Sequence, residues 1–129
     1  TKSSYITVRI VSDMGGPYMH SALIDGGTEN GIRKDQAVIS EAGLIGRVVD
    51  VGESSARVLL LNDINSRVPV ITEKTQEKSI LIGANTDRPT LAYLTADHKI
   101  TIGERVVTSG DGGIFPAGIP VGVVSSIHS

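Results

Sequence analysis

Cysteine is absent from the 129 residues, and aromatic side chains are scarce: three tyrosines, one phenylalanine and no tryptophan. The lack of cysteine excludes disulfides, thiolate nucleophiles and cysteine-ligated zinc, and it fits a cytosolic or a periplasmic address equally well. Four aromatic residues are too few for the stacking platforms with which proteins bind single-stranded nucleic acid.

Positive charge is neither abundant nor clustered. Twelve basic residues face fourteen acidic ones, the net charge is −2, and the longest basic run is the pair Arg33–Lys34. A phosphate-binding surface needs clustered Lys and Arg, so the sequence predicts no nucleic-acid partner. The longest apolar run, Val58–Leu61, is far below the ~20 residues that cross a bilayer, and the N-terminus lacks the apolar stretch of a signal peptide. These features indicate a soluble protein or the soluble part of a longer one.

Residues that favour β-strands are plentiful. Valine, isoleucine and threonine make up 39 of the 129 residues, and fifteen glycines and five prolines interrupt them at short intervals. This balance predicts an all-β fold of short strands, arranged as a sandwich or as barrels. Polarity patterns and turn residues place the strands at Tyr5–Val11, Tyr18–Asp25, Gln36–Ser40, Leu44–Val51, Arg67–Thr72, Ser79–Gly83, Thr90–Thr95, Glu104–Ser109 and Pro120–Ile127.

Two stretches of the chain lie between these predicted strands. Residues 13–17 are predicted to interrupt the strand pattern after the first strand. Residues 54–64 are predicted to form a further strand, although Val58, Leu61 and Ile64 also fit one face of a helix. We favour the strand because Gly52 and the pair Asn62–Asp63 bound a short run.

A weak internal repeat connects two parts of the chain. Residues 35–49 run from an acidic residue through a short strand, a serine and a glycine turn into a second strand, and residues 104–124 follow the same order with a longer connection. Two related hairpins would indicate two similar β units. The alternative is chance, because any β-rich chain with many valines and glycines aligns with itself somewhere.

No combination of residues predicts a catalytic, metal or cofactor site. His20, Asp63 and Ser109 occur in the order of a chymotrypsin-like triad, and residues 109–113 are similar to a serine-protease nucleophile loop. However, Asp111 precedes the two glycines where that loop needs its serine. The three histidines form no close pair, and no lysine follows Gly110–Gly113 as in a phosphate-binding loop.

One long motif carries a resemblance to a known family. Residues 106–124 read VVTSGDGGIFPAGIPVGVV, which resembles the C-terminal signature of the MreC family of bacterial rod-shape scaffold proteins. Shorter pieces follow in the family's order at residues 43–48, 59–63, 66–70 and 91–94. Two positions depart from the family pattern: Glu104 replaces a usual aspartate, and Asp111 occupies a position that is often apolar.

The resemblance implies an architecture and a location. The family has two small β-barrel subdomains built from short antiparallel strands, which here would comprise residues 1–55 plus 112–129 and residues 56–111. It also implies that a cytoplasmic tail, one transmembrane helix and a coiled coil precede this segment. The chain would then lie at the periplasmic face of the inner membrane and reach the membrane only through that helix.

The resemblance further implies a non-catalytic scaffold of cell elongation that needs no cofactor. Its partners would be the penicillin-binding transpeptidase of elongation, MreD, MreB indirectly or through the cytoplasmic tail, and further copies of itself. The alternatives are a chymotrypsin-like or degenerate hydrolase with a two-barrel fold and another kind of β-barrel binding domain.

Partner-binding residues are predicted from the short supply of large side chains. Interface hot spots favour aromatics and methionine, which points to Ile114 with Phe115, then Tyr93, then Tyr18 with Met19. Phe115 lies in a turn between Gly113 and Pro116, where exposure is plausible. The competing interpretation is that this single phenylalanine closes the end of a barrel.

Overall fold

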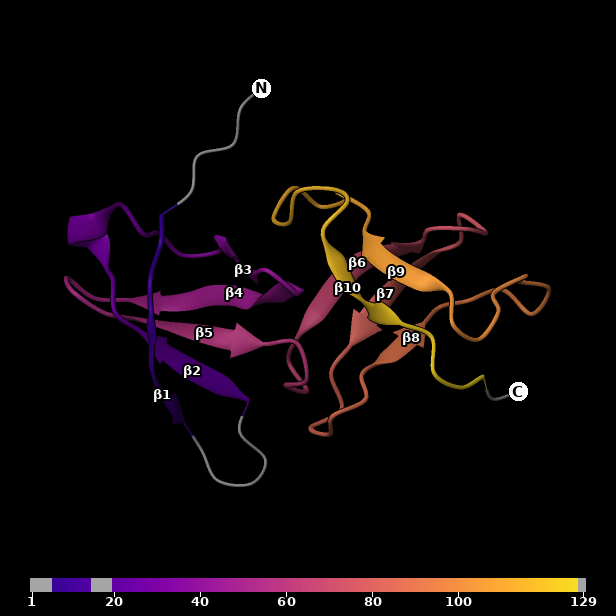
Figure 1. The fold of residues 1–129 in the computed structure, drawn as a ribbon, viewed down its shortest axis with the longest axis horizontal. Coiled ribbons are helices and arrows are strands. Elements are labelled where there is room, and N and C mark those ends of the chain that lie inside the picture. The colour runs from indigo at the N-terminus through magenta and orange to yellow at the C-terminus, as the bar shows by residue number, and fades with distance from the viewer. Residues whose placement is uncertain (1–5, 15–19, 128–129) are drawn as a thin grey trace.

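The computed structural model describes residues 6–14 and 20–127, and this part of the chain folds into two five-stranded antiparallel sheets. The first sheet has the strand order β1-β2-β5-β4-β3 and the second has the order β10-β9-β6-β7-β8. Figure 1 shows them as two lobes placed end to end. The strands are β1 Ile10–Met14, β2 Ser21–Ile24, β3 Ala37–Ser40, β4 Gly43–Val51, β5 Ala56–Leu60, β6 Arg67–Thr72, β7 Lys78–Ile82, β8 Thr90–Ala92, β9 Arg105–Thr108 and β10 Pro120–Val123. The predicted all-β fold is confirmed.

Each sheet buries the apolar residues of one face. The first core consists of Ile24, Ile32, Val48, Ala56 and Val58. The second core is larger and consists of Leu44, Val68, Val70, Leu81, Ile100, Val106, Phe115 and Val124. Strand β6 shows the underlying pattern, because buried Val68, Val70 and Thr72 alternate with more exposed neighbours.

Strand β4 connects the two lobes. Its residue Val48 lies in the first core, whereas Leu44 lies in the second. At Gly43 the chain passes so close to β10 that a Cβ atom built there would lie 2.3 Å from the carbonyl oxygen of Pro120. Gly43 also has a φ of +132°, which side-chain-bearing residues rarely adopt. Strand β4 therefore contributes side chains to both cores and contacts β10 of the second sheet.

The related hairpins predicted from the repeat both form antiparallel pairs. Strand β3 pairs with β4, and β9 pairs with β10 across the longer connection. Both pairs contain a shift of register, between Val38 and Ile39 in the first and between Pro120 and Gly122 in the second. The strand predicted within residues 54–64 is confirmed as β5, which is paired on both sides.

The first strand lies later in the chain than predicted. Alternation placed a strand at Tyr5–Val11 and a break at residues 13–17, but β1 covers Ile10–Met14 and Asp13 pairs with Ala22 of β2. Val8 packs against the first core although it belongs to no strand. Ile6 and Ile10, the other apolar residues of that alternation, are exposed, so the pattern does not mark a buried face. Strand β1 is defined by backbone pairing that polarity does not encode.

The two sheets do not coincide with the two predicted subdomains. Strand β5 belongs to the first sheet, and β10 hydrogen-bonds to β9 of the second sheet while also contacting β4 of the first. The predicted grouping of residues 1–55 with 112–129, apart from 56–111, concerns folding units rather than hydrogen-bonded sheets. That grouping stays a prediction.

The glycines of the loop between β9 and β10 are expected to maintain the backbone conformation of that loop. Gly112 and Gly113 have φ values of +80° and +77°, and no atom lies within 4 Å of a Cβ built on Gly113. Replacing either with valine should lower the free energy of unfolding by about 1–3 kcal/mol through backbone strain. Chemical denaturation measures the effect. Gly122→Val is the control, since Gly122 has open space and an ordinary φ; equal losses in all three variants would contradict the explanation.

Candidate functional site

The predicted partner-binding residues have different surroundings. Tyr18 and Met19 lie outside the described residues. Tyr93 follows directly after β8 and is 79% exposed, and Ile114 is 42% exposed. Phe115 is only 4% exposed and belongs to the second core. The structure thus supports the competing interpretation of Phe115 as a core residue, and it leaves Tyr93 and Ile114 as the accessible members of the set.

Thr108 fixes the loop that carries Ile114 and Phe115. Its buried hydroxyl donates to the carbonyl of Pro116 and accepts from the backbone N–H of Ile119, and its carbonyl accepts from the N–H of Gly118 at 2.8 Å. These bonds fold the loop back over β9, which places the Phe115 ring under it. Sequence analysis did not single out Thr108, although its place in the long motif could have drawn attention to it.

Glu104 is a buried carboxylate that joins three segments. It is 5% exposed and accepts hydrogen bonds from the N–H and hydroxyl of Thr75, at 2.6 and 2.7 Å, and from the N–H of Thr101 at 3.2 Å. Burial raises the pKa of Glu104, but the hydrogen bonds from Thr75, Thr101 and Lys74 outweigh burial and hold the pKa below its ordinary value of 4.5. Glu104 therefore stabilises the fold as a carboxylate.

The lowered pKa predicts how stability depends on pH. The contribution of Glu104 should be complete above the pKa of the unfolded chain and should disappear as the pH falls through the lower pKa of the folded chain. Glu104→Gln should lower the free energy of unfolding by about 1–3 kcal/mol at neutral pH, because the NH2 group of the glutamine amide cannot accept the hydrogen bonds that the carboxylate accepts. The difference in the free energy of unfolding between this variant and the parent chain should become smaller at acidic pH. Denaturation at several pH values measures this, and Glu41→Gln, at an exposed carboxylate, is the control. A difference independent of pH would contradict the role of the charge.

Two residues of the hypothetical catalytic triad, Ser109 and Asp63, have other partners. The hydroxyl of Ser109 donates to Asp111 at 2.9 Å, and Asp63 accepts from the backbone N–H of Asn65 at 2.7 Å. Ser109 follows β9 of the second sheet, whereas His20 precedes β2 of the first. Asp111 also pairs with Lys78 at 3.4 Å, and its pKa is lowered by the Ser109 hydroxyl and by Lys78. Ser109 and Asp111 thus stabilise a turn.

Within residues 6–14 and 20–127, no group of three or more His, Asp or Glu side chains is placed to hold a metal ion. Over the same residues, no helix has the length and apolar character needed to cross a membrane.

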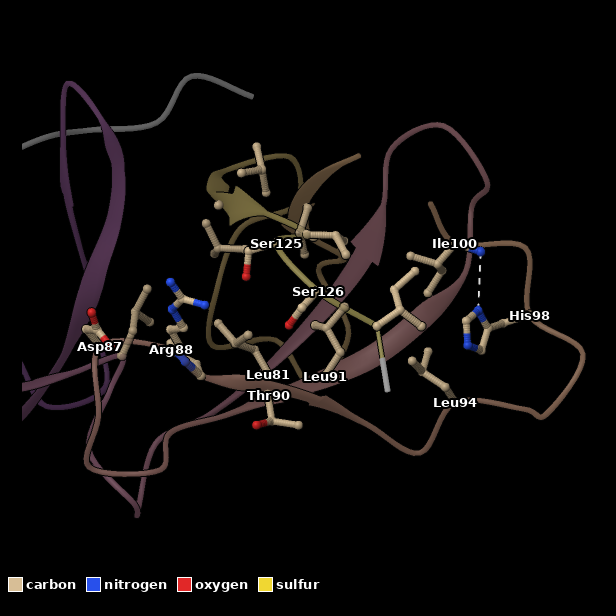
Figure 2. Close-up of a pocket in the computed structure, with 18 residues that line it drawn as sticks. Leu81, Asp87, Arg88, Thr90, Leu91, Leu94, His98, Ile100, Ser125 and Ser126 are labelled. Atoms are coloured by element: carbon tan, nitrogen blue, oxygen red, sulfur yellow. Dashed lines mark hydrogen bonds between the residues drawn. The ribbon is translucent and has the colours of Figure 1, made fainter. Parts of the chain in front are cut away.

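A groove with a volume of about 660 Å³ lies between β8 and the C-terminal segment, residues 121–127 (Figure 2). Its apolar lining includes Leu81, Leu91, Ile100 and Val124, and its polar lining includes Arg88 and His98. The Nδ1 atom of His98 accepts a hydrogen bond from the N–H of Ile100 at 3.2 Å, which anchors the ring at one end. Sequence analysis missed this groove, because the segments that line it are far apart in the chain.

These observations define a class of protein: an all-β module of two five-stranded antiparallel sheets, with a groove in the second one. Residues 10–129 match the family model described as the rod shape-determining protein MreC, barrel core. The chain is 49% identical over 114 residues to the cell shape-determining protein MreC of Caulobacter vibrioides, covering 88% of this chain and 33% of that protein. It is 38% identical over 123 residues to that of Escherichia coli, covering 95% of this chain and 34% of that protein.

Solved structures agree with the sequence matches. The crystal structure of MreC from Pseudomonas aeruginosa has a TM-score of 0.90 at 32% identity, covering 96% of this chain and 81% of that one. The major periplasmic domain from the cell shape-determining filament MreC, in a monoclinic form, has a TM-score of 0.79 at 27% identity, covering 94% and 81%. This chain belongs to the MreC family of non-catalytic cell-shape proteins. It spans between 32% and 47% of the length of the curated relatives it matches.

Proposed function

We propose that this chain is the periplasmic part of a scaffold that maintains rod shape in bacteria. The scaffold links the penicillin-binding transpeptidase of elongation to MreD and MreB and associates with itself. In the full-length protein, a single helix anchors it in the inner membrane. The observation that carries the proposal is the family match, which extends from β1 to the end of the chain.

Two further observations support a role in protein binding. One solved relative, at 24% identity, is MreC of Helicobacter pylori in complex with the penicillin-binding protein PBP2, and it shares the fold with a TM-score of 0.73. In this chain, the Tyr93 side chain is largely exposed and its φ is +63°. A bulky residue held in that conformation is costly, and such strain concentrates at functional sites.

Sheet edges are a second route to assembly. Strands β8 and β10 are the outer strands of the second sheet, so Pro120–Val123 provide part of an edge. Strand β6 offers no such edge, because it pairs with β7 and β9. Dynamic light scattering over a concentration series tests self-association. A strictly monomeric chain at millimolar concentration would refute self-association through this segment.

Tyr93 provides a test of partner binding. Tyr93→Asn should weaken binding of the purified transpeptidase ectodomain about tenfold or more, as expected for an aromatic hot spot. Asparagine tolerates positive φ, so the free energy of unfolding should change by less than about 0.5 kcal/mol. Titration calorimetry measures the affinity. Tyr93→Phe is the control and should bind like the parent chain. Unchanged affinity in Tyr93→Asn would remove Tyr93 from the proposed interface.

A further inference from the structure

We propose that the groove between β8 and the C-terminal segment binds an extended peptide segment by strand addition, with an acidic residue of that segment placed against Arg88. The occupant is defined by its chemistry: a short extended stretch, with alternating apolar side chains and a carboxylate at one end. The proposal does not depend on which protein supplies the segment.

The backbone of β8, on one side of the groove, selects an extended chain. The second sheet ends at β8 on one side and at β10 on the other, and the groove is lined by residues of both strands. Strand β8 pairs only with β7, so its outer edge has no strand beside it among the described residues. Unpaired N–H and C=O groups along a strand edge form a template for another strand.

The floor of the groove suits alternate apolar side chains. Leu81, Ile100, Val106 and Val124 form its buried part and are all less than 10% exposed. Val123 and Ile127 line the rim and remain 62% and 43% exposed. A strand laid in the groove would direct every second side chain toward this floor and would cover the rim residues.

The dimensions of the groove limit the length of the occupant. The three residues of β8 extend about 10 Å at about 3.3 Å per residue. A volume of about 660 Å³ is also within the range of sites that enclose most of a ligand's surface. A segment of about four to six residues therefore matches both the edge and the volume.

The charge of the lining predicts the carboxylate. Arg88 lines the groove, and its guanidinium is directed toward the hollow in Figure 2, on the side of Ser125. Among the described residues, no carboxylate forms an ion pair with Arg88. Asp87, the other charged lining residue, lies farther from Leu81 and Leu91 in that view. An acidic side chain at this end would pair with Arg88 while the rest of the segment lies on the apolar floor.

The test uses a defined peptide and the ¹⁵N-labelled chain. The probe is an acetylated and amidated six-residue peptide in which valine alternates with threonine and one end carries glutamate, made with the glutamate at either end. We expect one version to shift the amide signals of Thr90–Ala92 and Val121–Val123 in a saturable way. The same peptide with alternate nitrogens methylated cannot form a full ladder and should bind at least tenfold more weakly.

Charge exchange tests the role of Arg88. Arg88→Glu should weaken binding of the glutamate peptide at least tenfold, and a lysine version of the peptide should recover affinity for this variant. Arg33→Glu changes the net charge equally on the first lobe and should have no effect. Strand addition would be overturned by the absence of saturable shifts at millimolar peptide, or by equal binding of the methylated peptide. Equal losses in Arg88→Glu and Arg33→Glu would overturn the carboxylate pairing.

Discussion

Replacing Phe115 with alanine is expected to lower the free energy of unfolding by about 3–5 kcal/mol, as for other buried aromatic residues. The ring is 4% exposed and lies in the second core, so its removal leaves a cavity that the Thr108-anchored loop cannot readily fill. Urea denaturation followed by circular dichroism measures the loss.

Ile114 is the matched comparison, because it precedes Phe115 in the same loop but is 42% exposed. Ile114→Ala should cost about 1 kcal/mol or less. If Phe115→Ala left stability unchanged and abolished binding of the transpeptidase, Phe115 would be a surface anchor and its burial in this structure would be wrong.

Gly43→Ala should have a comparable effect for a different reason. The new Cβ would combine the strain of a φ of +132° with a 2.3 Å approach to the backbone oxygen of Pro120, and backbone cannot rotate away as a flexible side chain can. Strain and overpacking each typically cost about 1–3 kcal/mol, so the variant should lose about 2–6 kcal/mol. Thermal and chemical denaturation measure the loss.

Gly103→Ala separates the two contributions. Gly103 also has a positive φ, +90°, but nothing lies within 4 Å of its Cβ position. This variant should lose only the strain contribution, about 1–3 kcal/mol. Equal losses at Gly43 and Gly103 would show that the contact between β4 and β10 is looser than the structure indicates.

Sequence patterns predicted the strands of the central part of the chain well and their ends less well. Alternation located β6 within Arg67–Thr72 because one face of that strand is buried. Thr90–Thr95 was predicted as one strand, but β8 ends at Ala92 because Tyr93 adopts a positive φ. Such a conformation depends on tertiary surroundings, and nothing in the local sequence announces it. Pro120 was correctly placed at the start of a strand, and that strand is an outer one, which suits proline because it lacks the N–H that an inner strand needs.

The site was less predictable than the fold. Scarcity of aromatic residues pointed first to Phe115, which is buried, and only then to Tyr93, which is exposed. Composition gives the number of large side chains but not the side of the sheet on which a loop places them. The groove and the bonds of Glu104 bring together residues that are distant in sequence, so neither has a local signal.

The contact between Gly43 and Pro120 has a consequence for the order of folding. The two residues are 77 positions apart in the chain (120 minus 43), and contacts between distant residues form slowly because a long loop must first close. Leu44 completes the second core beside Val124, so this core can assemble only after the C-terminal residues have been synthesised. A chain that emerges N-terminus first must therefore keep its early β4 strand incompletely packed until the last strand arrives, and that interval is when it most needs protection from aggregation.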